Sequence, residues 1–146
     1  MLVKDLLKAN PKELICVREN TEVLEAMKLL LQHKISCLLI TDDDGYLMGI
    51  ISDKDIFRVC YEKQCDFSGM QVGDVMTTDV IVGVGSDDLS YIAGLMTNNR
   101  IRHVPVVEGE KLIGLVSIGD AVKAQMADVE AHNRYLWQYI DGTYPA

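Results

Sequence analysis

The chain has 146 residues, 49% of them hydrophobic, and 22 acidic against 14 basic residues give it a net charge of -8 at pH 7. This length allows one ordinary domain with a substantial core, and the negative charge argues against a nucleic acid as partner because a polyanion would be repelled. No stretch approaches the ~20 consecutive apolar residues that cross a bilayer, so we expect a soluble protein that does not contact membranes.

The amino-terminal segment carries charged side chains at Lys4, Asp5 and Lys8, where a secretory signal would need an unbroken apolar run. We therefore expect a cytoplasmic protein. The four cysteines lack both CxxC spacing and a regular framework: Cys16, Cys37, Cys60 and Cys65. Two of them lie in apolar runs, where free cysteine behaves as a small buried hydrophobe, so neither disulfides nor zinc are expected.

An internal repeat organises the chain. The string "VKDLL" at 3–7 corresponds to "VGDVM" at 72–76, and "GIISDKD" at 49–55 corresponds to "GLVSIGD" at 114–120. We divide the chain into a first copy at 1–60, a linker at 61–71, a second copy at 72–126 and a tail at 127–146.

Each copy is predicted to run strand, helix, strand, turn, strand, helix, which indicates an α/β class with two small sheets and packed helices. Strands are predicted at 14–17, 35–40 and the start of 49–55, and in the second copy at 80–84, 101–107 and the start of 114–120. The first helices should begin after Asn20 and Thr21, and after Ser86 and Asp87. Their buried faces should comprise Val23, Met27, Leu30 and Leu31, and Leu89, Ile92, Ala93 and Met96.

The phrase that closes each copy consists of a glycine, two apolar residues, a serine and, three positions later, an aspartate. Ser52 and Ser117 should lie where a strand turns into a helix, with exposed amide donors that suit a phosphate. Asp55 and Asp120 lie one turn further on, where a carboxylate can accept from the two hydroxyls of a ribose. The same residues also fit a plain helix N-cap with an acidic third position.

Through residue 126 or so, the chain resembles the tandem CBS domains, named after cystathionine beta-synthase. The resemblance rests on two copies of the "VxDxM"-type opening at 3–7 and 72–76, of the helix that follows the first strand, of the hairpin and of the Ser–Asp phrase. It implies a pseudo-twofold pair of repeats that binds an adenine nucleotide such as AMP, ADP or ATP in clefts between them, with no catalytic cofactor and no bound metal. NAD and S-adenosylmethionine share the adenosine and remain alternatives.

Carried over by position, the resemblance implies two clefts, each with the corner of one copy facing apolar residues of the other. One cleft would use Ser117, Asp120 and His103, facing Leu14, Ile15, Ile35 and Ser36. The other would use Ser52, Lys54, Asp55 and Arg102, facing Thr77, Val80, Ile81 and Ile101. His103 could equally be a packed strand histidine, and Arg102 a solvated edge charge.

The copies differ beside the serine that would bind the phosphate, because Lys54 lies two residues after Ser52 and Gly119 occupies the matching position after Ser117. The first copy also has three extra residues near "KANPKE". The sequence offers no metalloenzyme spacing and no nucleophile elbow, so we expect a regulatory module and not an enzyme. A ligand-free scaffold is the other function class. The tail has an apolar helical face beside three aromatic residues: Val129, Leu136 and Ile140 beside Tyr135, Trp137 and Tyr139. It should extend the last helix and cover either exposed core or a second subunit of a homodimer. Alternatively, it docks on an unknown client protein.

Overall fold

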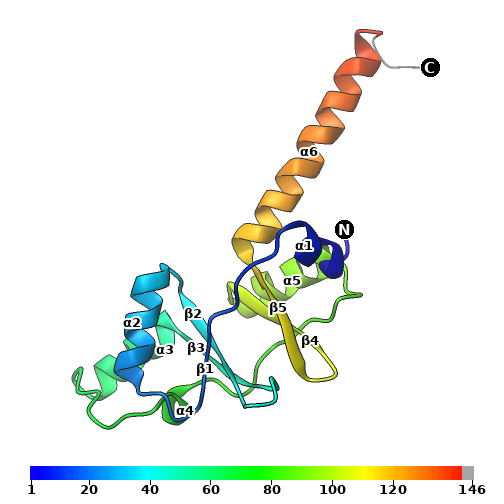
Figure 1. The fold of residues 1–146 in the computed structure, drawn as a ribbon. Helices are drawn as coiled ribbons and strands as arrows, with labels where there is room; N and C mark the ends of the chain where they lie inside the picture. Colours follow the sequence, from blue (N-terminus) through cyan, green and yellow to red (C-terminus); the bar gives the residue numbers. More distant parts are fainter. Residues whose placement is uncertain (143–146) are drawn as a thin grey trace.

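The computed structural model describes residues 1–142 and arranges them as two small units from which one long helix projects (Figure 1). The first unit contains β1 (Cys16–Val17), α2 (Val23–His33), β2 (Cys37–Thr41), β3 (Leu47–Ser52) and α3 (Asp53–Glu62). The second contains α5 (Leu89–Asn99), β4 (His103–Glu108), β5 (Lys111–Ser117) and α6 (Ile118–Ile140). Two further helices, α1 (Val3–Ala9) and α4 (Val72–Val75), open the two copies of the repeat. The expected α/β class with two small sheets is confirmed.

The two sheets are unequal, since one has the order β1-β2-β3 and the other contains only β4 and β5. The strand expected at 80–84 is reduced to an isolated bridge between Gly83 and Val106. A Cβ at Gly83 would lie 2.7 Å from Cδ1 of Ile92, so this segment packs closely against α5 and a larger residue would require the Ile92 side chain to shift. Glycine weakens strand formation, which accounts for the missing strand.

The helix starts lie one or two residues later than predicted. The N-caps are Glu22 for α2 and Asp88 for α5. Thr21 and Asp87 instead accept from the backbone amides of Arg18, at 3.2 Å, and Val84, at 2.8 Å. They therefore stabilise the turns that lead into the helices.

Each unit has its own apolar core, and the predicted helix faces are largely in it. One prediction is wrong: Leu31 is 79% exposed, whereas Ala26 is fully buried. The first cluster also contains Phe67, which lies in the segment between the two copies. The burial of Phe67 holds the segment 61–71 against the first unit.

The opening helices are exchanged between the units. Val3 and Leu6 of α1 belong to the core of the second unit, and Val72 of α4 belongs to the core of the first. Backbone bonds support the exchange, with the Val3 amide donating to Asp87 and the Val72 amide to Thr21. The segment between α1 and β1 therefore has to cross from one unit to the other, and it passes beside the candidate site.

The carboxyl-terminal helix extends as predicted, since α6 continues to Ile140. Its first turns contribute Ala121 to the core of the second unit, but the predicted tail does not cover the core. Val129, Leu136 and Ile140 are 59%, 42% and 72% exposed, and this part of the helix projects away from both units (Figure 1). The predicted tail also includes residues 143–146, which lie outside the described residues. Within residues 1–142, no helix combines the length and the apolar character needed to cross a lipid bilayer.

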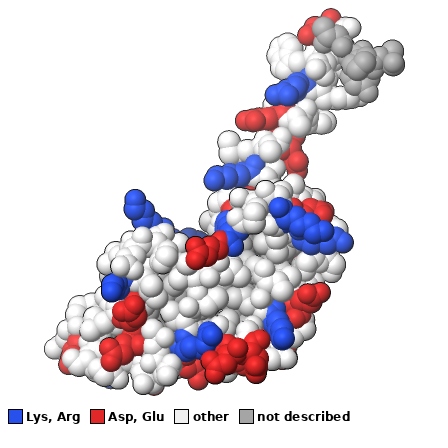
Figure 2. All heavy atoms as spheres, in the orientation of Figure 1, with Lys and Arg blue, Asp and Glu red and all other residues white. Residues whose placement is uncertain are grey.

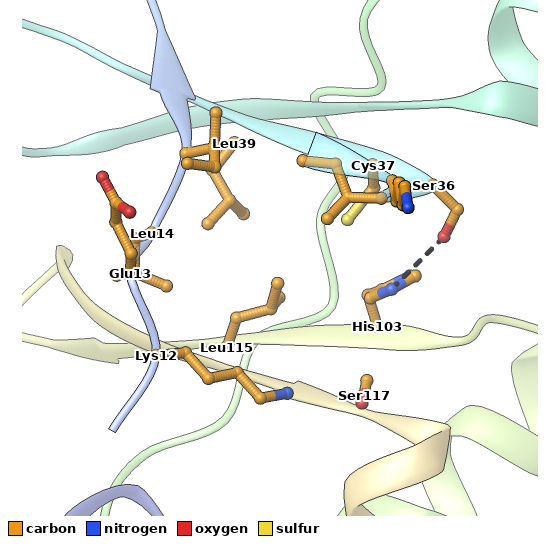
Figure 3. A pocket seen from close by; sticks show the side chains of 12 residues that line it. Lys12, Glu13, Leu14, Ser36, Cys37, Leu39, His103, Leu115 and Ser117 are labelled. Atoms are coloured by element: carbon orange, nitrogen blue, oxygen red, sulfur yellow. Dashed lines mark hydrogen bonds between the residues drawn. The ribbon is translucent and has the colours of Figure 1, made fainter. Parts of the chain in front are cut away.

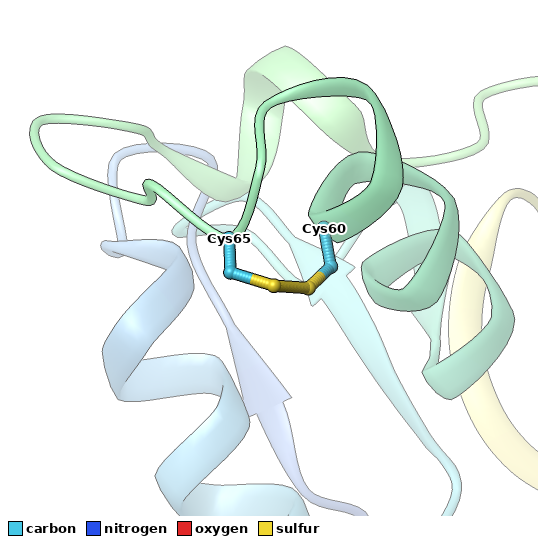
Figure 4. The surroundings of a disulfide bond; sticks show 2 residues. All are labelled: Cys60 and Cys65. Atoms are coloured by element: carbon cyan, nitrogen blue, oxygen red, sulfur yellow. A yellow bond between two sulfur atoms is a disulfide. The ribbon is translucent and has the colours of Figure 1, made fainter.

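The expectation that cysteines would not form a disulfide is wrong for one pair. Cys60, in the last turn of α3, is bonded to Cys65 in the following loop (Figure 4). The loop folds back on the helix, and the Cys65 amide donates to the Cys60 carbonyl at 2.8 Å. The spacing of five residues matches no familiar motif, so the pairing follows from this local turn and could not be read from the sequence.

Candidate functional site

The corner at Ser52 begins α3 and is stabilised by a reciprocal set of hydrogen bonds. The Ser52 amide donates to the Asp55 carboxylate at 2.9 Å, and the Asp55 amide donates to the Ser52 hydroxyl at 3.3 Å. This is the capping box that the sequence allowed as an alternative. Thr77 adds a hydroxyl that donates to Asp55 at 3.3 Å, and the Arg58 guanidinium lies 3.4 Å from the same carboxylate.

The corner at Ser117 begins α6 with the same geometry. Its amide donates to Asp120 at 2.9 Å, and the Asp120 amide donates to the Ser117 hydroxyl at 3.2 Å. Here the additional partner of the carboxylate is the ammonium group of Lys12, which reaches it from the crossing segment. Burial opposes ionisation of Asp120, but the hydrogen bonds from Lys12 and Ser117 outweigh it, and the pKa lies below its ordinary value.

The first cleft has a volume of about 440 Å³ and lies between the two units. Figure 3 shows the Lys12 side chain extending across it with its nitrogen toward Ser117. Asp120 was predicted to contact the ligand, but it is 7% exposed and does not line the cleft. Lys12 pairs with its carboxylate and covers it in the structure. The other residues predicted for this cleft all line it: Leu14, Ile15, Ile35, Ser36, His103 and Ser117.

The second cleft has a volume of about 430 Å³ and holds the corner of the first unit. It brings together every residue predicted for it: Ser52, Lys54, Asp55, Thr77, Val80, Ile81, Ile101 and Arg102. Arg58 and Arg100 also line it and were not assigned to it from the sequence, although both are basic residues close to assigned ones.

The cationic groups of the second cleft are partly compensated. Arg102 is 57% exposed and donates to Asp53 at 2.9 Å, so in this structure it is an edge charge tied to a carboxylate. Lys54 has no ion pair among those found in residues 1–142. On the face shown in Figure 2, basic side chains are interspersed with acidic ones and form no continuous patch. The clefts thus offer separate cations that suit a small anion.

His103 lies between the two clefts and lines both. It is half-buried on β4, and its Nε2 lies 3.4 Å from the Ser36 hydroxyl, the bond drawn in Figure 3. Burial, followed by the charges of Arg102 and Lys12, lowers its pKa below the ordinary value of 6.5. The imidazole is therefore neutral at pH 7 and acts as a hydrogen-bonding group.

Lys12 is the most important residue that the sequence analysis did not assign. The three extra residues of the first copy did mark its neighbourhood. The contact with Asp120 depends on the exchange of α1 to the second unit, which no local pattern reveals.

The sequence model of the CBS domain family matches this chain twice, at residues 3–62 and 72–127. A CBS domain-containing protein of Arabidopsis thaliana, CBSX3, named as mitochondrial, is 32% identical over 97% of this chain and 73% of its own length. The L-aspartate semialdehyde sulfurtransferase of Methanocaldococcus jannaschii is 32% identical, but the match covers 82% of this chain and 22% of that protein.

Two similar solved structures contain adenosine compounds. CBSX2 in complex with AMP has a TM-score of 0.75 and 31% identity, covering 86% of this chain and 96% of that one. The CBS domain pair of MJ0100, in complex with 5-methylthioadenosine and S-adenosyl-L-methionine, has a TM-score of 0.76 and 29% identity, covering 88% and 98%. The two matched segments, the paired units and these relatives lead to one conclusion: the chain belongs to the CBS domain family as a tandem pair.

Proposed function

We propose that this protein is a regulatory module that binds an adenine nucleotide between its two CBS repeats and acts in trans on a client protein. One observation carries the proposal. In each cleft the helix-start serine of one repeat faces apolar side chains of the other repeat: Ser117 in the first cleft, and Ser52 together with Asp55 in the second. A ligand that contacts both sides can link the geometry of the two units to its own binding.

The chemistry of the corners matches the parts of a nucleoside monophosphate. Asp55 offers a carboxylate to a pair of ribose hydroxyls, and the amides at the start of α3 with Lys54 suit a phosphate. Val80, Ile81 and Ile101 provide an apolar surface for a base. AMP has about 23 non-hydrogen atoms, and about 0.3 kcal/mol for each gives a dissociation constant near 10 μM.

The test is a calorimetric titration of AMP into protein freed of bound nucleotide, with Asp55→Ala and Asp120→Ala as variants. We expect micromolar binding to the unmodified protein and at least a tenfold loss at the cleft whose aspartate is removed. An AMP affinity that stays the same within twofold in both variants would contradict the assignment of the ribose contacts.

A second candidate is a binder of another adenosine compound. It is favoured by the methylthioadenosine and S-adenosylmethionine bound to the MJ0100 pair, and by Glu13 in the first cleft, which could face a sulfonium group. A scaffold without ligand is the third, since both corners are complete helix caps. Titration of S-adenosylmethionine beside AMP separates the second candidate from the first, and heat from neither would leave the scaffold.

The proposal includes a non-enzymatic role, a cytoplasmic location and a homodimer. Catalysis is not proposed because neither corner serine belongs to a nucleophile elbow and the histidines have no ligand spacing. For the homodimer, α6 carries one exposed stripe with steps of four and three residues, the spacing of a coiled-coil seam. The stripe consists of Val122, Met126, Val129, Asn133, Leu136 and Ile140.

A further inference from the structure

The two Ser–Asp corners differ in the side chain that contacts the aspartate from the opposite repeat. Asp55 accepts from the short, neutral hydroxyl of Thr77, at 3.3 Å. Asp120 is paired with the ammonium of Lys12. Both partners come from the segment that follows the opening helix of a repeat, α4 for Thr77 and α1 for Lys12. This segment, in which the first copy has three extra residues, therefore places a hydroxyl at one aspartate and a cation on a long stem at the other.

Lys12 occupies the region that a ribose would need. Its side chain spans the first cleft toward Ser117 (Figure 3), and its ammonium takes the carboxylate to which the ribose hydroxyls would bind. Both aspartates are 7% exposed, but Asp55 lines the second cleft, whereas the first cleft is lined by Lys12 and not by Asp120. A ligand in the first cleft therefore has to displace Lys12 to reach the carboxylate. Thr77 also contacts its aspartate, but both residues line the second cleft, so its carboxylate faces the cavity.

Other charges do not remove this difference. Arg58 lies 3.4 Å from Asp55, but it belongs to the next turn of the same helix and is 54% exposed. A monodentate pair of this kind contributes little and is easily separated. Lys12, 37% exposed, differs in that its pair joins the two repeats and that it, not Asp120, lines the first cleft.

We propose that Lys12 is a specificity-determining residue that makes the two clefts unequal: it competes with the ribose for Asp120, so an adenine nucleotide fills the second cleft first. The inference rests on the proposed function and deepens it. The second cleft is the high-affinity site for a nucleoside monophosphate. The first cleft accepts only a ligand whose contacts offset the loss of the Lys12–Asp120 pair.

A reciprocal exchange tests this inference. The variants are Lys12→Thr, which gives the first cleft the hydroxyl of the second, and Thr77→Lys, which does the reverse. Lys8→Thr, an exposed lysine of α1 outside both clefts, is the matched control for the loss of one positive charge. Each protein is titrated with AMP, and the Asp55→Ala background isolates the first cleft.

We expect Lys12→Thr in the Asp55→Ala background to tighten AMP binding about tenfold, Thr77→Lys to weaken the second cleft by a similar factor, and Lys8→Thr to resemble its parent within twofold. Two equal sites in the unmodified protein, or weaker binding by Lys12→Thr, would overturn the inference and leave the proposed function intact. Absence of AMP binding in every variant would overturn the proposed function and this inference with it.

Discussion

At the scale of single residues, His103 couples stability to pH. Its folded-state pKa lies below the ordinary value of 6.5, so between these two values the unfolded chain binds more protons than the folded one. Stability is therefore complete above the unfolded pKa and falls as the pH is lowered toward the folded pKa. We expect the melting temperature to decrease in this window, and the decrease to be smaller in His103→Gln.

The measurement is thermal unfolding of both proteins across that pH range. For each protein, the melting temperature at pH 8 is compared with that at each lower pH. The reference is pH 8 because the histidine is neutral there in both the folded and the unfolded state. Identical pH dependence in the two proteins would show that His103 is not the titrating group.

The two corners of the candidate site could be predicted from the sequence, because the Ser–Asp phrase is local and occurs twice. The residues that face each corner were predicted only through the resemblance to tandem CBS domains. The corner geometry follows from helix capping alone. The partner of Asp120 could not be predicted, since Lys12 is far from it in sequence and reaches it through the exchanged helix. Arg102 similarly finds Asp53 across the two repeats, a pairing that no spacing rule indicates.

At the scale of elements, the exchange of α1 is the feature that joins the two units. Leu6 is 9% exposed in the core of the second unit, so Leu6→Ala should lower the free energy of unfolding by about 3 kcal/mol through lost burial and the cavity left behind. Leu31→Ala is the matched control, because this leucine is 79% exposed on α2 and its truncation should change the free energy by less than about 0.5 kcal/mol.

Urea denaturation of the two variants checks this prediction. Hydrogen exchange shows which part of the chain is destabilised. In Leu6→Ala we expect the amides of α5 and β4 to lose protection before those of β2. An equal loss of stability in the two variants would mean that α1 does not contribute to the core as described.

Most helices and strands were predicted correctly because the apolar periodicity that defines them is local. The missing strand at 80–84 and the exposed Leu31 depend on tertiary packing, in one case the close contact of Gly83 with Ile92. The Cys60–Cys65 disulfide depends on a turn in which Gln64 and Cys65 both have positive φ, and that turn has no clear signal in the sequence.

At the scale of the whole molecule, α6 provides the surface for the proposed homodimer. In a symmetric helix pair the apolar stripe would meet its own copy, and Asn133 at a seam position would favour a defined register. Val129→Glu places a charge in this stripe, and we expect it to convert the dimer to a monomer at micromolar concentration. Ala131→Glu adds the same charge to the opposite face of the helix and should leave the dimer intact.

Light scattering coupled to size-exclusion chromatography distinguishes the two outcomes for these variants. A monomeric unmodified protein at micromolar concentration would contradict the homodimer itself. A dimer that persists in Val129→Glu would place the interface on another surface of the two units.

The central claim is that an adenine nucleotide binds between the two repeats. Its most direct test is the methyl NMR spectrum of protein labelled at isoleucine, leucine and valine, recorded during titration with AMP. We expect the signals of Val80, Ile81 and Ile101 to shift first, while Val129 on the projecting helix stays unchanged. Shifts at none of these three residues under saturating AMP, or shifts confined to other parts of the chain, would contradict the account.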